Sequence, residues 1–156
     1  MKIKIMLDEG AKMPTRAHET DAGLDLYTPV DVRVDGCKIQ SGGNWDGCAY
    51  GTVRVGSATI DTGVHIEIPR GYVGFIKSKS GLMVKNDLTA DGTIDSGYVG
   101  SIRVKLFNHG SQSYKFKKGE KIAQLVLLPI ITPDLEFVCS LDETERGDNG
   151  FGSTGR

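Results

Sequence analysis

The sequence lacks the features that define several large classes of protein. None of the apolar runs in its 156 residues approaches the roughly 20 residues that a membrane-spanning helix needs. Cysteine is scarce, and Cys37, Cys48 and Cys139 form an odd number without CxxC spacing, which is not typical of a disulfide framework. We therefore expect no membrane association and a reducing compartment, most simply the cytoplasm.

An excess of one charge is also missing. The 19 basic and 20 acidic residues give a formal net charge of −1, and no basic stripe is present. This balance argues against a nucleic-acid polymer as the ligand. His18, His65 and His109 are scattered, with no HExxH pattern and no Cys/His cluster, so a zinc ion held by protein ligands is not expected.

Helical periodicity is nearly absent, whereas glycine is abundant, with 21 residues. Short segments that alternate between polar and apolar residues recur, separated by turn residues. We expect strands at residues 2–7, 23–27, 30–34, 52–55, 64–68, 72–76, 101–107 and 122–128, and a short helix around 83–85. This pattern predicts an all-β sandwich or barrel.

The chain is most simply one domain. We assign residues 1–141 to it and regard 142–156, polar and then glycine-rich, as a flexible C-terminal arm. Residues 35–58 are rich in glycine and contain the only tryptophan, Trp45. This stretch predicts a long hairpin or excursion, with 52–55 as its return strand.

The stretch 87–100 contains the most suggestive group of side chains. Asp91-Gly92 suits the turn of a β-hairpin, because both residues tolerate positive φ. Asp95 follows the apolar Ile94, and Tyr98 comes three residues later, so the carboxylate and the ring could face one cavity. The alternative is a surface hairpin with a solvated acid and a packed tyrosine.

Two further stretches offer groups that could bind phosphate. Residues 78–81 provide a lysine and two hydroxyls and, if a helix follows, backbone amides at its N-terminus; the alternative is a capped helix start with an exposed lysine. Gln124 interrupts an apolar run that we expect to be buried on both faces. An unpaired buried amide costs about 1–3 kcal/mol, so Gln124 needs a partner, either structural or a ligand.

Two other stretches are less specific by themselves. Asp21 and Asp25 flank an apolar residue pair, and Asp25 should lie on the face opposite Leu24 and Leu26; the alternative is a turn acid and an exposed strand acid. Residues 146–156 carry an arginine, an aromatic ring and hydroxyls, but no Walker A pattern. Here the alternative is an unstructured terminus.

Taken together, in order and spacing, these stretches resemble the five motifs of the trimeric deoxyuridine triphosphatases. They are residues 21–25 (DAGLD), 78–82 (SKSGL), 92–100 (GTIDSGYVG), 119–125 (GEKIAQL) and 146–154 (RGDNGFGST). The resemblance covers nearly the whole chain except 35–58. It implies a homotrimer of distorted, jelly-roll-like β-barrels, each with a short helix and a C-terminal arm that closes over an active site.

The resemblance also implies an activity, the Mg²⁺-dependent hydrolysis of dUTP to dUMP and pyrophosphate. This reaction keeps uracil out of DNA and supplies dUMP for dTMP synthesis. Asp95 matches the carboxylate that activates water for attack on the α-phosphorus, and Tyr98 matches the ring that packs on the deoxyribose. Mg²⁺ would be held mainly by the triphosphate, with Asp25 supporting its water shell.

The remaining contacts with dUTP are implied in the same way. The backbone around Thr89, Thr93 and Ile94 matches the part that reads uracil. The residues that match phosphate contacts and the closing arm are Lys79, Ser80, Gly81, Gln124, Arg146, Phe151, Gly152 and Ser153. The family usually has arginine at position 79, and lysine keeps the charge but loses the bidentate fork.

Two other functions compete with this interpretation. A dCTP deaminase of the same fold needs a glutamate where Lys105 stands, and lysine cannot shuttle the protons, so deamination is disfavoured. A regulatory protein-binding module, as in some phage members, would use residues 35–58 to contact a protein partner. The intact Asp95 and Tyr98 indicate that activity is retained even then. The residues do not distinguish a cellular from a viral source, for which the compartment would be the host cytoplasm.

Overall fold

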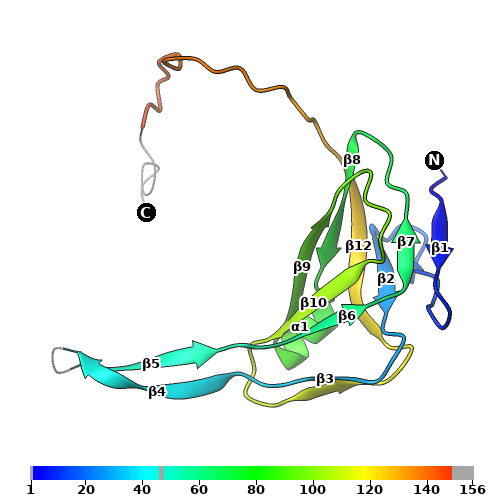
Figure 1. Ribbon diagram of the computed structural model, residues 1–156, viewed down its shortest axis with the longest axis vertical. Helices are drawn as coiled ribbons and strands as arrows, with labels where there is room; N and C mark the ends of the chain where they lie inside the picture. Colours follow the sequence, from blue (N-terminus) through cyan, green and yellow to red (C-terminus); the bar gives the residue numbers. More distant parts are fainter. Residues whose placement is uncertain (1, 46–47, 149–156) are drawn as a thin grey trace.

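The structure, a computed structural model, describes residues 2–45 and 48–148 (Figure 1). Its strands are β1 Ile5–Leu7, β2 Gly23–Tyr27, β3 Val32–Val34, β4 Lys38–Trp45, β5 Cys48–Arg54, β6 Gly56–Asp61, β7 Val64–Ile66, β8 Tyr72–Lys77, β9 Leu88–Ile94, β10 Arg103–Asn108, β11 Tyr114–Phe116 and β12 Lys121–Pro129. The short helix α1 spans Ser80–Asn86. The predicted all-β class with a short helix is confirmed.

A curled six-stranded sheet forms the body of the molecule (Figure 1). Its strand order is β2-β12-β8-β9-β10-β6, and all neighbouring pairs are antiparallel. Short two-stranded sheets, β1-β7 and β11-β3, accompany it. The curvature makes a half-barrel, which is the jelly-roll-like architecture that the sequence predicts.

The core follows from period-two alternation along the strands. In β10, Val104 and Leu106 are buried, whereas the alternate residues Arg103 and Lys105 are exposed. The largest apolar side chains with almost no exposure are Leu26, Val34, Val64, Ile76, Leu88, Ile102, Val104, Leu106, Phe116, Ile122 and Leu125. They come from strands distributed along the whole chain, so the core forms only when these distant strands have paired.

The strand β12 departs from its predicted burial. Its first half is buried at Ile122, Ala123 and Leu125, but Leu128 is 44% exposed. The prediction of a strand buried on both faces is therefore wrong for the second half. The reason is that the pairing of β12 with β2 ends at Val126, so its last three residues have β8 as their one strand partner.

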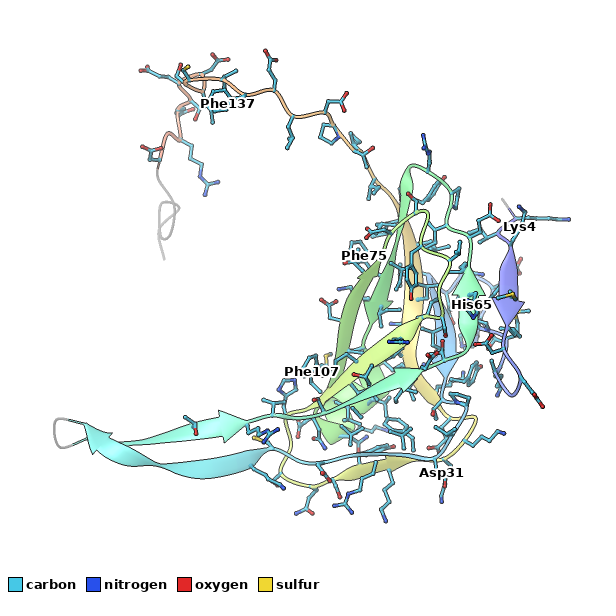
Figure 2. All side chains as sticks on the ribbon, viewed as in Figure 1. Lys4, Asp31, His65, Phe75, Phe107 and Phe137 are labelled. Carbon is cyan, nitrogen blue, oxygen red and sulfur yellow. The ribbon has the colours of Figure 1, made fainter. Side chains whose placement is uncertain are left out.

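The segment after β12 leaves the body of the molecule (Figure 1). It carries large apolar side chains that are almost fully exposed, among them Leu135 (96%) and Phe137 (93%), and Figure 2 shows Phe137 far from the sheet. The predicted boundary between domain and arm at residue 141 stays a prediction.

The turn predicted at Asp91-Gly92 is wrong. Both residues lie inside β9, where Asp91 pairs with Lys77 and Gly92 with Ile76. Gly92 does not use a positive φ, and the chain turns later, at Gly97, with φ of 90°. An Asp-Gly pair permits a turn but does not impose one, and the ladder offered by β8 keeps it extended.

The glycine-rich stretch forms the expected hairpin, β4 paired with β5, which projects from the body (Figure 1). Two glycines at its base touch backbone atoms. A Cβ on Gly56 would lie 1.7 Å from the Asp35 carbonyl oxygen, and one on Gly36 would lie 2.3 Å from that of Ser111. No other residue fits these positions without displacing backbone. We call residues 35–58 the arm hairpin, which is distinct from the C-terminal arm at residues 142–156.

Membrane insertion by a helix finds no support in the part of the chain that the structure describes. No helix there is both long enough and apolar enough to cross a bilayer.

Asn108 is a buried polar residue that joins three segments. Its amide nitrogen donates to the carbonyl oxygens of Val34 (3.2 Å) and Gln112 (2.9 Å), and its side-chain oxygen accepts from the Gly110 amide (3.0 Å). These bonds attach β3 and the turn after β10 to the body.

We predict that Asn108→Ala lowers the free energy of unfolding by about 2 kcal/mol, because buried backbone groups lose their partners. Denaturant titration followed by circular dichroism measures this change. Gln112→Ala is the matched control, since Gln112 is exposed and contributes only its backbone carbonyl. Equal stability of the two variants would contradict the assignment.

Candidate active site

Asp95 lies in a hollow of about 250 Å³, which is lined by Thr93, Ile94, Asp95, Tyr98 and Arg103. The hollow forms where two strands diverge. The first half of β9, up to Ala90, pairs with β10, but from Asp91 onward β9 pairs with β8 alone. Strand β10 pairs with β6 along its whole length, but only its second half, Leu106–Asn108, also pairs with β9. The end of β9 and the start of β10 therefore separate and leave space between them.

A tight turn after β9 brings the carboxylate and the ring together. The buried Ile94 anchors the end of the strand, and the Tyr98 amide donates to the Asp95 carbonyl at 3.2 Å. The Tyr98 hydroxyl donates to the Ser101 carbonyl at 3.0 Å. A Cβ on Gly100 would lie 2.5 Å from the Tyr98 hydroxyl, so glycine at position 100 makes room for the ring.

A second polar cluster surrounds Asp25. The alternative interpretation, in which Asp25 is an exposed strand acid, is wrong. Asp25 is only 5% exposed. One carboxylate oxygen pairs with Lys79 and the other with Lys121, at 2.6 Å from its Nζ. Burial would raise the pKa of the Asp25 carboxyl, but the hydrogen bonds from Lys121 and Lys79 outweigh burial and lower this pKa. Asp25 is thus a buried, ionised and doubly paired carboxylate.

Gln124 has the structural partner that its position required. Its Nε2 donates to the Ser78 carbonyl at 3.2 Å. A Cβ on Gly23 would lie 2.4 Å from the Gln124 Oε1, so glycine makes room for the amide. The Ser78 hydroxyl in turn contacts the carbonyl oxygen and the amide of Ala90, at 3.0 and 2.9 Å. These contacts connect β12, the segment before α1 and β9.

The remaining residues predicted to contact dUTP lie outside the Asp95 hollow or outside the described residues. Ser80 and Gly81 form the exposed start of α1, with Lys79 at its N-cap. Thr89 bonds through its hydroxyl to the His109 Nε2 (2.8 Å), and it does not line the Asp95 hollow. Arg146 lies in an exposed turn of the C-terminal segment. The predicted arm residues Phe151, Gly152 and Ser153 lie outside the described residues.

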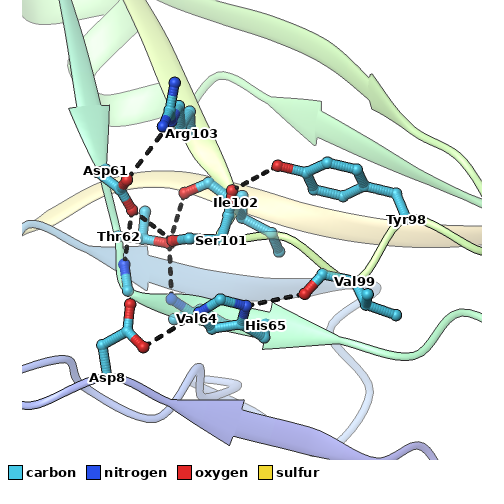
Figure 3. Close-up of polar contacts among 11 residues, drawn as sticks. Asp8, Asp61, Thr62, Val64, His65, Tyr98, Val99, Ser101, Ile102 and Arg103 are labelled. Atoms are coloured by element: carbon cyan, nitrogen blue, oxygen red, sulfur yellow. Dashed lines mark hydrogen bonds and ion pairs between the residues drawn. The ribbon is translucent and has the colours of Figure 1, made fainter.

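The sequence interpretation missed two residues. Arg103 lines the Asp95 hollow, and its Nε lies 3.4 Å from the Asp61 carboxylate (Figure 3). Alternation with the apolar Val104 places Arg103 on the polar face, but which cavity it reaches depends on strand divergence. Lys121 lies within the fourth motif stretch, so its charge was visible beside Gln124, but not its pairing with Asp25.

The two clusters do not merge within one chain. Of the residues that the structure describes, none of those assigned to phosphate binding lines the Asp95 hollow. In residues 2–45 and 48–148, no group of three or more His, Cys, Asp or Glu side chains could hold a metal ion. The geometry therefore presents a carboxylate with an adjacent aromatic ring in one place and an aspartate paired with two lysines in another.

Comparisons with known proteins point to one family. A family model described as dUTPase matches residues 51–155. The chain is 42% identical, over 159 residues, to the deoxyuridine 5'-triphosphate nucleotidohydrolase of Clostridium tetani, covering 100% of this chain and 97% of that protein.

Solved structures agree with this match. The dUTPase of Staphylococcus bacteriophage 80alpha with dUPNHPP has a TM-score of 0.80 and 31% identity, with 99% of each chain covered. A mutant dUTPase of phage phi11 of S. aureus, solved with a structural Mg(II) ion, has a TM-score of 0.73 and 28% identity, covering 92% of this chain and 100% of that one. With its motifs, its fold and its full-length relatives in agreement, this chain belongs to the dUTPase family.

Proposed function

We propose that this protein hydrolyses dUTP to dUMP and pyrophosphate. The observation that carries the proposal is the hollow in which the exposed Asp95 carboxylate and the Tyr98 ring share one space. Full-length relatives are deoxyuridine 5'-triphosphate nucleotidohydrolases, and the phage 80alpha dUTPase was solved with dUPNHPP. The reaction removes dUTP, which keeps uracil out of DNA, and it supplies dUMP for dTMP synthesis.

Asp95 acts as the general base in this proposal. Its carboxylate takes a proton from a water molecule as the water oxygen forms a bond to the α-phosphorus. The bond from the α-phosphorus to the bridging oxygen breaks, and pyrophosphate leaves with the electron pair. The exposure of Asp95 supports this role, because the water must reach it.

Tyr98 sets the choice of sugar. Its position is fixed by the backbone bond from the Tyr98 amide to Asp95 and by the bond from its hydroxyl to Ser101. The ring therefore presents a fixed apolar surface beside the Asp95 carboxylate. A deoxyribose packs on such a surface, whereas a 2′-hydroxyl would lose its hydration there. The backbone of Thr93 and Ile94, which line the same hollow, would read uracil.

The lysine-rich cluster binds the triphosphate. Lys79, with Ser80, Gly81 and Gln124, would contact phosphate oxygens, and Arg146 would clamp the γ-phosphate. Asp25 holds Lys79 at this site when no nucleotide is bound, and a phosphate would compete for the same ammonium group. Phe151, Gly152 and Ser153 would then cover the uracil ring and close the site.

In this scheme Mg²⁺ is bound mainly by the triphosphate of dUTP. Asp25 does not fit a direct metal ligand, because Lys79 and Lys121 occupy both of its oxygens. The described residues also offer no carboxylate cluster of the kind that holds Mg²⁺. We therefore regard the Mg²⁺ complex of dUTP as the substrate and assign no catalytic step to a metal held by the protein.

We predict that Asp95→Asn lowers kcat for dUTP by at least about 100-fold, because the amide cannot accept the proton from water. Binding of a non-hydrolysable dUTP analogue should remain, since the amide has nearly the same shape. Pyrophosphate release and calorimetric titration measure the two quantities. The control is Asp91→Asn, an exposed strand acid of β9 that pairs with Lys77. Near-normal turnover by the Asp95 variant would overturn the role.

The active unit is a homotrimer in this proposal. A single chain separates the Asp95 hollow from the phosphate cluster, so a neighbouring copy would complete each site. Apolar side chains on residues 130–141, including Leu135 and Phe137, are exposed in the isolated chain. Burying each such side chain against another copy contributes about 1.5–3 kcal/mol, which supports exchange of this segment between subunits.

We predict a particle of three chains in solution at micromolar concentration, measured by light scattering coupled to size exclusion. Replacing Leu135 and Phe137 with serine should dissociate it, because the segment loses its apolar contacts. Val84→Ser is the matched control, since Val84 is exposed on α1. A monomeric wild-type particle would contradict the trimer.

The arm hairpin favours a second, regulatory function as a protein-binding surface. It projects from the body (Figure 1), its base is packed closely at Gly36 and Gly56, and none of its residues lines the Asp95 hollow. Neither polar cluster of the active site uses a residue of the arm hairpin. Deamination finds no such support, because Lys105 stands at the position of the required glutamate.

We predict that replacing residues 39–53 with an Asn-Gly turn leaves kcat/KM for dUTP within about twofold, because the hairpin lies outside the site. The same protein should lose any partner that co-purifies with the full chain. Loss of dUTP hydrolysis in a folded variant would assign the arm hairpin to catalysis instead.

The proposal places the protein in the cytoplasm. Cys37 and Cys139 are free thiols. Free thiols persist in a reducing environment, which supports the cytoplasm.

A further inference from the structure

His65 connects the two-stranded β1-β7 sheet to the loop that carries Tyr98. It lies in β7, where its backbone pairs with Met6 of β1. Its ring reaches the loop between β9 and β10, and its Nδ1 lies 2.8 Å from the Val99 carbonyl oxygen (Figure 3). The other ring nitrogen, Nε2, lies 3.2 Å from an oxygen of Asp8. Val99 directly follows Tyr98, so this contact holds the loop beside the sugar-binding ring.

Both ring nitrogens of His65 face groups that only accept hydrogen bonds. A carbonyl oxygen and a carboxylate can each be satisfied only by an N–H, so both contacts form together only in the imidazolium. A neutral ring directs a lone pair at one of the two acceptors. The bond to the Val99 carbonyl and, second, the bond to Asp8 raise the pKa of His65.

The rest of the loop is anchored without His65. The Ile102 amide donates to the Val64 carbonyl at 2.8 Å, and the Thr62 hydroxyl donates to the Ile102 carbonyl at 2.7 Å. The Ser101 hydroxyl donates to Asp61 (Figure 3). These bonds hold the loop from Ser101 onward at any pH near neutrality. Between the end of β9 and Ser101, the tether from His65 to Val99 is the side-chain contact that depends on protonation.

We propose that His65, as an imidazolium, is a positioning residue for the hollow of Asp95 and Tyr98, and that its deprotonation loosens the sugar-binding side of that hollow. The inference rests on the proposed dUTP hydrolysis and adds a pH-dependent element to it. His65 touches no substrate atom in this scheme. It acts through Val99 on the position of the Tyr98 ring.

The charged groups around His65 favour its protonated form. Asp8 follows β1 and contacts the ring directly, and Asp61 at the end of β6 adds a second negative charge. Lys4 lines the adjoining hollow of about 210 Å³, together with Glu67. These two pair with each other at 3.0 Å, so the Lys4 charge is largely offset. Arg103 approaches only through its ion pair with Asp61.

The direction of the pH effect follows from the raised pKa. A group whose pKa is higher in the folded state contributes its full stabilisation below its unfolded pKa of about 6.5. This contribution is lost as the pH rises through the folded-state pKa. The tether to Val99 is therefore complete in mildly acidic solution and weakens as the pH rises past that higher value.

The first test compares kcat and KM for dUTP and UTP across pH in the wild type and two variants. In the wild type, KM for dUTP should rise by about threefold or more through the His65 titration, because the Tyr98 ring loses its fixed position; kcat should change by less than about twofold. His65→Gln keeps a donor for Val99 but cannot titrate, so this rise should vanish. His65→Leu should show the higher KM at every pH and weaker discrimination against UTP.

His18→Gln is the matched control, because His18 is exposed and lies away from the Val99 contact. It should keep the wild-type pH profile. A rise in KM that persists in His65→Gln would overturn the proposal, and so would a wild-type KM that is constant through the His65 titration. Absence of any dUTP hydrolysis would instead overturn the proposed function.

A second measurement does not depend on catalysis. Nitrogen chemical shifts of the His65 ring, assigned by comparison with His65→Gln, report its protonation directly. The pKa should lie above 6.5, and Asp8→Asn, which keeps an acceptor but removes the charge, should lower it. A His65 pKa at or below 6.5 would overturn the proposal, even if the His65 variants fail to fold well enough for kinetics.

Discussion

The pairing of β9 is the constraint on which the active site depends. Strand β9 pairs with β10 over Leu88–Ala90 and with β8 over Asp91–Ile94, so it changes partner in the middle. This divergence opens the hollow that contains Asp95 and Tyr98. The same continuous ladder keeps Asp91 and Gly92 extended, and so delays the turn until Gly97. Asp95 directly follows the last residue of this strand, Ile94, and so lies where the chain leaves β8.

Electrostatics divide the proposed chemistry between two places. Asp95 is exposed and available to water, as a base must be. Asp25 is buried and paired with two lysines, which suits a residue that holds cations in position for an anionic substrate. One chain does not bring these carboxylates into one hollow. The exposed apolar segment after β12 supports the proposed trimer, since a large exposed apolar surface is typical of an interface.

Local patterns predicted much of the fold. Sequence patterns identified the strands β2, β8 and β10, and the order of the five motif stretches predicted that Asp95, Tyr98, Lys79 and Gln124 act together, which stays a prediction. Prediction failed where the outcome depended on distant neighbours. The burial of β12 depended on how far its partners extend, and the conformation of Asp91-Gly92 depended on β8. The roles of Lys121, Arg103 and His65 required contacts between strands that are remote in the chain.

The sequence alone therefore determined the fold class, the family resemblance and the residue types available for chemistry. These are properties of periodicity and motif order, which a linear chain already contains. Only the tertiary structure decided that Asp25 is neutralised by Lys79 and Lys121, that Arg103 reaches the Asp95 hollow and that both nitrogens of His65 face acceptors. The physical reason is that burial and hydrogen bonding are set by pairs of residues whose separation in space is fixed by strand register, and register across a curled sheet emerges only when the whole core has packed.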